Sequence, residues 1–291
     1  ITGYDAAAPP AYDVQTAYGY GGPLFVGPWD ACGKRRALRC VADYLRSTGV
    51  VAEFVRCHTH WVDVEALRDA GYATPQVRTD VVYRVGGKSP EDILAEWNRL
   101  EGRHLRRARK CGLRDRTGHG GPGVAAFKAL YDLTADRVAM DPFYRFDAPY
   151  LSAICGQGEG QVQVVLAEAP GEPPPVVAAA ILFLGPALAH PHLVGWDAAY
   201  SPSRPNDFLY WAMACRAAAA GCRWISWGGG LTNDPADPLL RFKLRFGDGA
   251  VPVHIGCRVI DDGRYRALCR EWARRNPGRA GTVDRFLRYR F

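Results

Sequence analysis

Helical and strand-like segments alternate in this chain, and they do so twice in the same order. In the first round, apolar residues recur at helical spacing over residues 31–48, and a glycine follows. Strand-like segments come next at 50–56 and 77–85, and a capping box at 89–92 begins a long helix that runs to about Cys111. This alternation predicts an α/β fold.

The second round repeats this order from about residue 123. The predicted elements are helices at 123–139 and 147–156, a strand hairpin at 161–168 and 176–184, a strand at 190–196, a helix at 205–220 and a buried strand at 223–227. We therefore predict two similar halves with mixed sheets, residues 1–122 and residues 123–291.

Composition excludes several classes of protein. Of 291 residues, 48% are hydrophobic and 23% charged, and no apolar run approaches the ~20 residues of a membrane span. The nine cysteines are scattered, without a CxxC pair that would indicate a zinc ribbon or a redox dithiol. We predict a cytoplasmic protein without membrane insertion or metal. The chain begins at Ile1 without a signal peptide, so a trimmed start is expected.

The chain is basic, with a net charge of +7 and a pI near 9.0. Only five of its 37 basic residues are lysine, and the others are arginine. Because arginine binds phosphate and carboxylate through paired N–H groups, this surface suits a polyanion. A GC-rich genome would also produce an arginine-rich composition, so the charge alone does not identify a partner.

The most basic stretch lies within residues 99–116. At 3.6 residues per turn, Arg99, Arg103, Arg106 and Lys110 share one helix face, where they could contact several phosphates at once. A solvated helix face would produce the same pattern. Almost no aromatic residue is interleaved, so stacking of single-stranded bases is not indicated.

A run of glycines followed by an isolated lysine is the second chemical signal. Gly228–Gly230 come directly after the strand that ends at Trp227, and such a run lets a ligand approach the backbone closely. Lys243 follows Phe242 in an apolar segment. A half-buried ammonium there would stabilise an oxyanion or hold a phosphate, whereas the alternative is a surface lysine that extends into water.

Two histidine pairs, His58 with His60 and His190 with His192, each lie on one face of a predicted strand. No nearby acidic or cysteine ligand accompanies either pair, so we interpret them as structural or hydrogen-bonding residues. The motifs of serine hydrolases, phosphate-binding loops, zinc proteases and dinucleotide-binding folds do not occur.

Several segments are shared, in order and spacing, with one family: Tyr18–Pro23, Glu53–His58, Arg103–Gly112, Phe127–Tyr131, His192–Asp197, Pro205–Gly221, Trp227–Gly230, and Phe242-Lys243 with Phe246. They extend over roughly residues 17–246. In these segments the chain resembles the FemXAB-like aminoacyltransferases of the GNAT superfamily. The pairing of the glycine run with Phe242-Lys243 is the most specific part of the resemblance.

The resemblance implies two tandem GNAT-like subdomains with mixed, mostly antiparallel sheets flanked by helices. It also implies transfer of an amino acid from aminoacyl-tRNA to an amine, on a peptidoglycan precursor or a natural-product intermediate. Lys243 matches the family lysine that holds the tRNA end or the tetrahedral oxyanion, and Phe242 would pack beside it. The aminoacyl ester is already activated, so no cofactor is expected. No acidic residue marks a general base, and the tRNA ribose hydroxyl or a phosphate would relay the proton.

The same segments supply candidate binding residues. We assign the acceptor to backbone N–H groups and a fixed cation, at Tyr18, Tyr20, Gly21, Gly22, Arg56, Trp227, Gly228, Gly229 and Gly230. We assign the tRNA phosphates to Arg103, Arg106, Arg107, Lys110 and Arg204. For the turn that contains Gly21 and for Arg56, a purely structural turn and a strand-edge ion pair are the alternatives.

Two other functions remain open from the sequence. An acyl-CoA-dependent N-acyltransferase of the same fold, using acetyl-CoA or another acyl-CoA, would need a glycine-rich turn before a helix to hold the pyrophosphate. The matching residues, 203–207, contain Arg204 and no glycine. A catalytically inactive RNA-binding protein would use the basic helix and bind RNA in a salt-sensitive way without acyl transfer.

Overall fold

The structure, a computed structural model, describes residues 1–5, 9–17, 19, 21–158, 160–232, 234–281 and 285–290, and only the backbone of residues 98–102. In this described part of the chain, no helix has both the length and the apolar character needed to cross a membrane. The nine cysteines are free thiols. The cytoplasmic location stays a prediction.

The chain forms two compact units. Unit 1 comprises Ile1–Arg78 and Pro252–Phe291, and unit 2 comprises Thr79–Val251. These limits differ from the division expected at residue 122, because α3 (Pro90–Lys110) packs against α6 (Pro205–Ala219) within unit 2. The last residues of the chain return to unit 1. Whether each unit is a separate GNAT-like subdomain stays a prediction.

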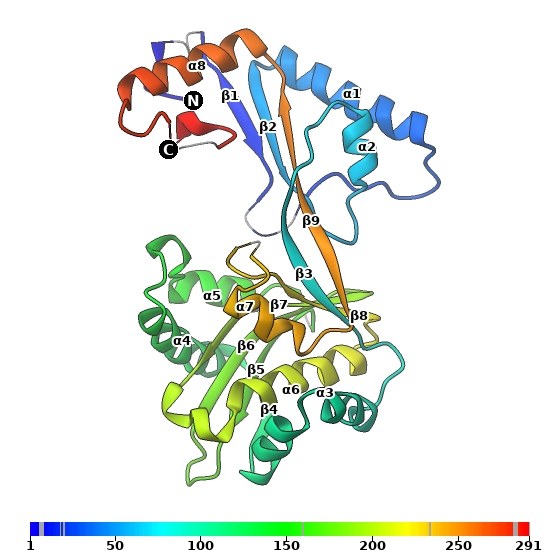
Figure 1. The fold of residues 1–291 in the computed structure, drawn as a ribbon, viewed down its shortest axis with the longest axis vertical. Helices are drawn as coiled ribbons and strands as arrows, with labels where there is room; N and C mark the ends of the chain where they lie inside the picture. Colours follow the sequence, from blue (N-terminus) through cyan, green and yellow to red (C-terminus); the bar gives the residue numbers. More distant parts are fainter. Residues whose placement is uncertain are drawn as a thin grey trace. The chain divides into compact units, whose positions relative to one another are not determined.

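Unit 1 contains three neighbouring strands in the order β1-β2-β9. β1 (Tyr12–Gln15) is parallel to β2 (Val50–Arg56), and β2 is antiparallel to β9 (Gly249–Val259). Leu38 of α1 (Ala31–Ser47) and Leu67 of α2 (Val64–Asp69) pack with Val55 of β2. On the other side of these strands from α1 and α2 lies α8 (Asp262–Arg275) (Figure 1). Its Trp272 packs with Val51 and with Tyr289 of the short helix η4 (Arg288–Arg290).

Unit 2 has the strand order β3-β8-β7-β6-β5-β4. Its strands are β3 (Gln76–Arg84), β4 (Arg114–Gly118), β5 (Val162–Glu168), β6 (Val176–Leu184), β7 (Leu188–Trp196) and β8 (Trp224–Gly228). Its other helices include α4 (Gly120–Arg137), η2 (Pro142–Tyr144), α5 (Ala148–Cys155), η3 (Ala198–Ser203) and α7 (Pro238–Leu244). β7 and β8 are parallel, and the other strand pairs are antiparallel. The predicted mixed, mostly antiparallel α/β fold is confirmed.

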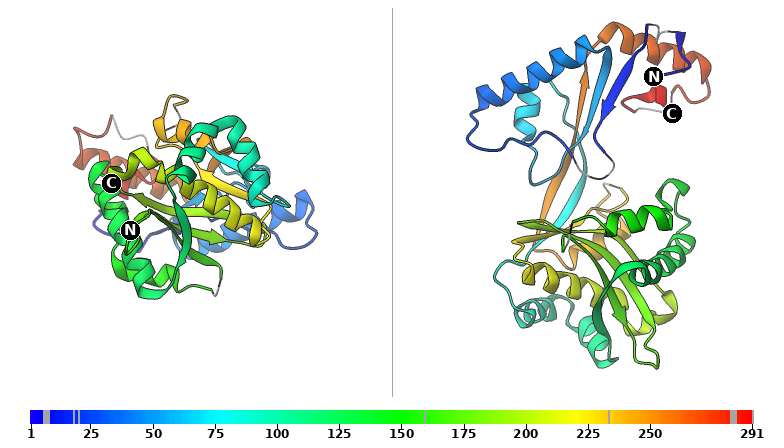
Figure 2. Two further views of the ribbon diagram at one scale, coloured as in Figure 1. Left: turned by 90° about the horizontal axis from the view of Figure 1, so that it is seen from below. Right: turned by 180° about the vertical axis from the view of Figure 1, so that it is seen from behind.

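Alternating side chains on β5 and β6 produce the layers of unit 2. Val165 and Leu182 face the core that α3 and α6 share, whereas Leu166 and Ile181 face α4 and α5. Successive residues of a strand point to opposite faces, so the apolar runs predicted at 161–168 and 176–184 supply two cores. The sheet therefore lies between two helical layers (Figure 2).

Candidate functional site

The parallel strands β7 and β8 pair only at their first residues, Leu188 with Trp224 and Ala189 with Ile225. Between these two strands, both fully described, no later pair is formed. Beyond the last pair, His190 Nδ1 lies 3.0 Å from the Ser226 carbonyl oxygen and bridges the strands through a side chain. The carboxyl ends of β7 and β8 therefore have backbone groups that do not bond to each other.

The predicted glycine run and the predicted lysine meet directly after β8. Lys243 Nζ donates a 2.7 Å hydrogen bond to the carbonyl oxygen of Gly229. Gly228 has a φ of +72°, a conformation that glycine adopts without strain. A Cβ on Gly230 would lie 2.7 Å from Cγ of Asp237. The run therefore turns a carbonyl, rather than a row of amides, toward the cation.

Asp237 fixes both this turn and the start of α7. One of its carboxylate oxygens accepts from the amides of Leu239 and Leu240 at 2.8 and 3.0 Å. The other accepts from the amides of Leu231 and Thr232, both at 2.9 Å. The hydrogen bond from Leu240, with those from Thr232 and Leu239, lowers the pKa of Asp237 to about 2. The ionised carboxylate thereby positions the helix that carries the lysine.

Aromatic rings pack beneath α7. Trp227 is only 2% exposed, and its Nε1 donates to the Phe246 carbonyl oxygen at 2.9 Å. The rings of Phe242 and Phe246 have centroids 5.1 Å apart, and Tyr210 of α6 lies 5.1 Å from Phe242. Phe242 therefore joins α7 to α6, while the neighbouring Lys243 turns to the glycine carbonyl.

Two arginines and a histidine surround a buried carboxylate at the start of α6. The side chain of Asp207 is 6% exposed, with Arg245 Nη2 2.6 Å from its Oδ1 and Arg204 Nε 3.3 Å from its Oδ2. His104 Nδ1 lies 2.7 Å from Arg245 Nη2 and 2.5 Å from Arg204 Nη2. Two guanidinium charges against one carboxylate leave excess positive charge, which suits an anionic ligand.

The other predicted phosphate contacts lie on α3. Arg103, Arg106 and Lys110 are exposed, on the side of the helix opposite the buried Leu105 and Ala108. Arg107 is also exposed, and its Nε donates to the Pro202 carbonyl oxygen at 2.6 Å, which ties α3 to the segment before α6. The side chain of Arg99 lies outside the described residues. The basic face is therefore next to the cluster around Asp207, to which α3 contributes His104.

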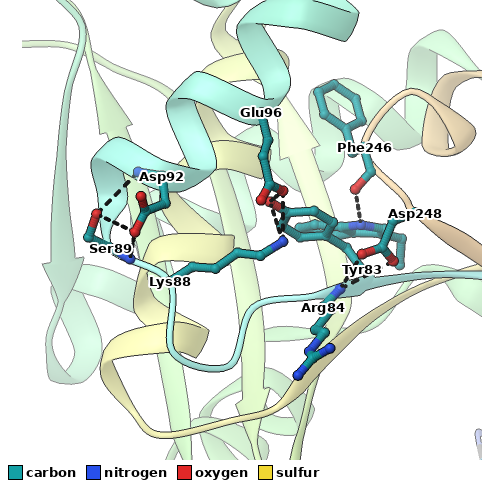
Figure 3. Close-up of polar contacts among 9 residues, drawn as sticks. Tyr83, Arg84, Lys88, Ser89, Asp92, Glu96, Phe246 and Asp248 are labelled. Atoms are coloured by element: carbon teal, nitrogen blue, oxygen red, sulfur yellow. Dashed lines mark hydrogen bonds and ion pairs between the residues drawn. The ribbon is translucent and has the colours of Figure 1, made fainter.

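The first turns of α3 are held on β3, as Figure 3 shows. The amide of Asp92 donates to Ser89 Oγ at 3.1 Å, and the amide of Ser89 donates to the Asp92 carboxylate at 2.9 Å. This is the capping box predicted from the sequence. Glu96 accepts from Tyr83 Oη at 2.6 Å and from Lys88 Nζ at 2.7 Å. These contacts fix the direction of the helix that presents the basic face.

The predicted acceptor turn, which lies between β1 and α1 in the sequence, belongs to unit 1. Gly21 donates from its amide to the Arg56 carbonyl oxygen at 2.9 Å. A Cβ on Gly22 would lie 2.4 Å from Cγ2 of Val62. Tyr18 and Tyr20, also predicted to bind the acceptor, lie outside the described residues.

The side chain of Arg56 contacts residues of unit 1. Its Nη1 donates to the Thr16 carbonyl oxygen at 2.9 Å, and its guanidinium carbon lies 4.9 Å from the centroid of the Phe54 ring. The structure thus brings Gly21, Gly22 and Arg56 together in unit 1. Trp227, the glycine run, Phe242, Lys243, Arg204 and the α3 residues belong to unit 2.

A cavity of about 480 Å³ lies elsewhere in unit 2, at the turn from β4 to α4. Its lining includes His119, Gly120, Cys155 and Gln163. Among the described residues, none of the predicted site residues lines it. We therefore centre the candidate site on the end of β8, α7 and the start of α6.

The family description "Acetyltransferase (GNAT) domain" matches residues 97–243 of the chain. The chain belongs to the GNAT acetyltransferase family. In this GNAT protein the match includes β7, β8 and the glycine run, and it ends at Lys243. An acyltransferase activity follows from the family. No curated protein sequence matches the chain.

Solved structures resemble this GNAT protein over most of its length. The crystal structure of FemX has a TM-score of 0.68 at 13% identity, covering 81% of this chain and 79% of that chain. The C-terminal domain of a putative lysylphosphatidylglycerol synthetase from Agrobacterium fabrum has a TM-score of 0.56 at 16% identity, with coverages of 88% and 81%. L-PGS from Bacillus licheniformis has a TM-score of 0.52 at 11% identity, with coverages of 78% and 73%. The predicted resemblance to FemX-like GNAT proteins is confirmed at the level of the fold.

Proposed function

We propose that this protein is an aminoacyltransferase that moves an amino acid from aminoacyl-tRNA to an amine acceptor and forms an amide. The observation that carries the proposal is which residues form the first turn of α6. A helix that holds a pyrophosphate presents free backbone N–H groups at its first turn. Here Pro205, which has no N–H, occupies the first position, and the Asp207 carboxylate lies in the same turn.

The cations near that carboxylate favour a donor with a repeating phosphate backbone. Arg204 and Arg245 offer guanidinium groups at the start of α6, and the exposed residues Arg103, Arg106 and Lys110 extend the basic surface along α3. At 1.5 Å per residue, the segment from 103 to 110 spans about 10 Å, longer than one pyrophosphate. A nucleic acid would neutralise more of this charge than an acyl-CoA would.

The chemistry requires little beyond alignment and charge stabilisation. The amine nitrogen attacks the carbonyl carbon of the aminoacyl ester, and the resulting oxyanion needs a preorganised donor. We assign that donor role to Lys243, held at the Gly229 carbonyl, and a packing role to Phe242. The acceptor is a small-molecule or peptidyl amine, as in a peptidoglycan precursor or a natural-product intermediate, and Trp227, Gly228 and Gly230 line the turn assigned to it.

The test is binding of mixed aminoacyl-tRNA and of acetyl-CoA, side by side at two salt concentrations. We expect tRNA binding that weakens with salt, and a double variant Arg103→Gln with Arg106→Gln that lowers the salt slope by about 2. The charge-matched control is Arg270→Gln with Arg274→Gln, exposed on α8 of unit 1. Saturable acetyl-CoA binding with only nonspecific tRNA binding would overturn the proposal in favour of acyl-CoA. Specific tRNA binding without transfer to any amine would favour an RNA-binding protein.

A further inference from the structure

β7 contains a β-bulge at His192, beyond the point where β7 and β8 stop pairing. On β6, Leu182 lies opposite Pro191 and Ile181 lies opposite Leu193, so His192 has no residue of its own across the ladder. An extra residue in one strand redirects its side chain out of the regular alternation. The bulge is therefore a feature that aims one particular imidazole.

The imidazole of His192 is directed to the side of the sheet that carries α4 and α5. Its ring stacks on Phe183 of β6, with centroids 4.8 Å apart and planes inclined by 15°. The ring of Phe146 lies 6.4 Å away, and Tyr150 Oη of α5 lies 3.4 Å from His192 Nε2. These contacts hold a half-buried ring in one orientation while part of it stays accessible.

The helix that carries Lys243, α7, packs on the opposite side of the sheet. Its neighbour Phe242 packs on the core that α3 and α6 share, whereas Phe183, Phe146 and Tyr150 pack on the core of α4 and α5. β7 lies between the two sets of residues, and its outer half does not pair with β8. An acyl group held at this end of β7 would thus have the lysine on one side and His192 on the other.

The surroundings of His192 favour its neutral form. Burial lowers the pKa of His192, and burial raises the pKa of Tyr150. The groups that face the imidazole are the phenyl rings from β6 and from the segment before α5, and the neutral Tyr150 hydroxyl from α5. A neutral imidazole can accept a proton at physiological pH.

We propose that His192 is the proton acceptor for the attacking amine, an inference that rests on the aminoacyltransferase function proposed above. In the tautomer assigned here, Nε2–H donates to Tyr150 Oη, and Nδ1 is the acceptor. The amine nitrogen bonds to the ester carbonyl carbon while Nδ1 takes the amine proton. The bond between that carbon and the ribose oxygen then breaks, and the ribose oxygen receives the proton from the imidazolium. The products are the amide and a tRNA hydroxyl.

The sequence alone did not indicate a residue for the role of proton acceptor. Spacing alone showed His190 and His192 as one pair on one face of a strand, and it favoured structural roles for both. The bulge separates them. His190 bridges to the Ser226 carbonyl oxygen, while His192 turns to Tyr150.

The experiment compares wild type with His192→Phe, which keeps a flat stacking ring and removes the proton acceptor. Aminoacyl-tRNA affinity and transfer rates are measured from pH 5 to 9. We expect His192→Phe to lower kcat by about 10²–10⁴-fold and to abolish the acidic limb of the pH–rate profile, with unchanged tRNA affinity. Tyr150→Phe, which keeps the imidazole, should move the midpoint of that limb without removing it. His119→Gln, an exposed histidine in the turn before α4, should leave the profile unchanged.

The outcomes separate the two proposals. If wild type does not transfer from aminoacyl-tRNA, the proposed function and this inference both fail. If wild type transfers and His192→Phe retains the acidic limb, only the role of His192 fails, and the residue is a packing residue of the bulge. If His192→Phe does not fold, an unmoved midpoint in Tyr150→Phe overturns the inference.

Discussion

In unit 2, the glycine turn after β8 presents a carbonyl oxygen to Lys243, whereas the glycine turn of unit 1 is closed by backbone hydrogen bonds. Gly21 exchanges hydrogen bonds with the strand beside it, from its amide to Arg56 and from the amide of His58 to its own carbonyl. Gly22 packs against Val62. In the sequence the two turns look equally suited to a ligand. In the structure the unit 2 turn is bonded to a charged side chain, and Gly22 of the unit 1 turn packs against an aliphatic one.

The difference shows what a glycine run does and does not specify. Glycine permits a close approach, but residues outside the run determine which group approaches. For Gly229 that group is an ammonium 14 residues later, on a helix fixed by Asp237. For Gly22 it is an aliphatic side chain. We therefore expect substitutions in the unit 2 turn to affect chemistry and those in the unit 1 turn to affect stability.

The largest effect is expected for Lys243→Met, which keeps most of the aliphatic stem and removes the charge. Loss of one oxyanion donor lowers kcat by about 10²–10³-fold. The melting temperature should stay close to that of wild type. Lys128→Met on α4, whose ammonium pairs with Asp132 at 2.6 Å, is the matched control and should retain activity. Equal activities of the two variants would mean that Lys243, and with it the unit 2 turn, has no chemical role.

Gly22→Ala should destabilise unit 1 strongly. Gly22 has a φ of +111°, and the added Cβ would meet Val62 at 2.4 Å. The left-handed backbone and the overpacking together cost about 2–5 kcal/mol. Gly19→Ala provides the comparison, since Gly19 has a φ of +101° but no atom of the described residues lies within 4 Å of the added Cβ. We expect a loss of about 1–2 kcal/mol there. Urea unfolding followed by circular dichroism measures both, and equal losses would exclude the contact with Val62 as a cause.

Asp237→Asn should produce a smaller effect, present at neutral pH, lost in acid and centred on α7. The pKa of Asp237 is about 2 in the folded protein, below the ordinary aspartate value of about 3.9. Its carboxylate therefore stabilises the fold fully above about pH 4, and this contribution disappears as the pH falls toward 2. The variant should lower the melting temperature at neutral pH and show a weaker dependence on pH between 4 and 2. An unchanged dependence would mean that other carboxyl groups govern acid unfolding.

The smallest effect is expected for His58→Gln in unit 1. Burial, with a contribution from His60, lowers the pKa of His58 to about 4. Below about pH 6.5 the unfolded chain binds a proton that the folded chain does not, so stability falls as the pH drops from about 6.5 to 4. The variant should flatten this part of the stability profile, as thermal melts at several pH values would reveal. If the variant loses stability as steeply as wild type between about pH 6.5 and 4, another histidine causes this loss.

The elements predicted best are those whose signals are local. The capping box at Ser89 and the helix predicted at 205–220 with its glycine stop depend on neighbouring residues. Both are present, the helix as α6 (Pro205–Ala219). β4 was missed because its sequence, Arg114–Gly118, is charged and has no apolar alternation; it pairs only with β5 in the described part of the chain. β9, which contains Pro252, was also missed.

The site was predicted in part for the same reason. The glycine run and Lys243 are close in sequence, and the structure joins them. The Asp207 cluster depends on packing of α3, α6 and the end of α7, and only its Arg204–Asp207 pair at i,i+3 has a local signal. Asp237 followed by Pro238 is also a local signal for a helix start, a capping residue with proline at the first helical position. We did not predict α7 from it.

Unit 1 consists of two segments that are far apart in the sequence, and this has a consequence for its synthesis. Unit 2 is contiguous, so a ribosome delivers all of it before residues 252–291 are made. Unit 1 needs those last residues, because β9 pairs with β2 and Tyr4 Oη donates to the Tyr289 carbonyl oxygen at 2.8 Å. At about 5–20 residues per second, translation of residues 252–291 takes roughly 2–8 s. During that interval the apolar side chains of β2 that pack against α8 in the folded protein, Val51 and Ala52, do not yet have that cover.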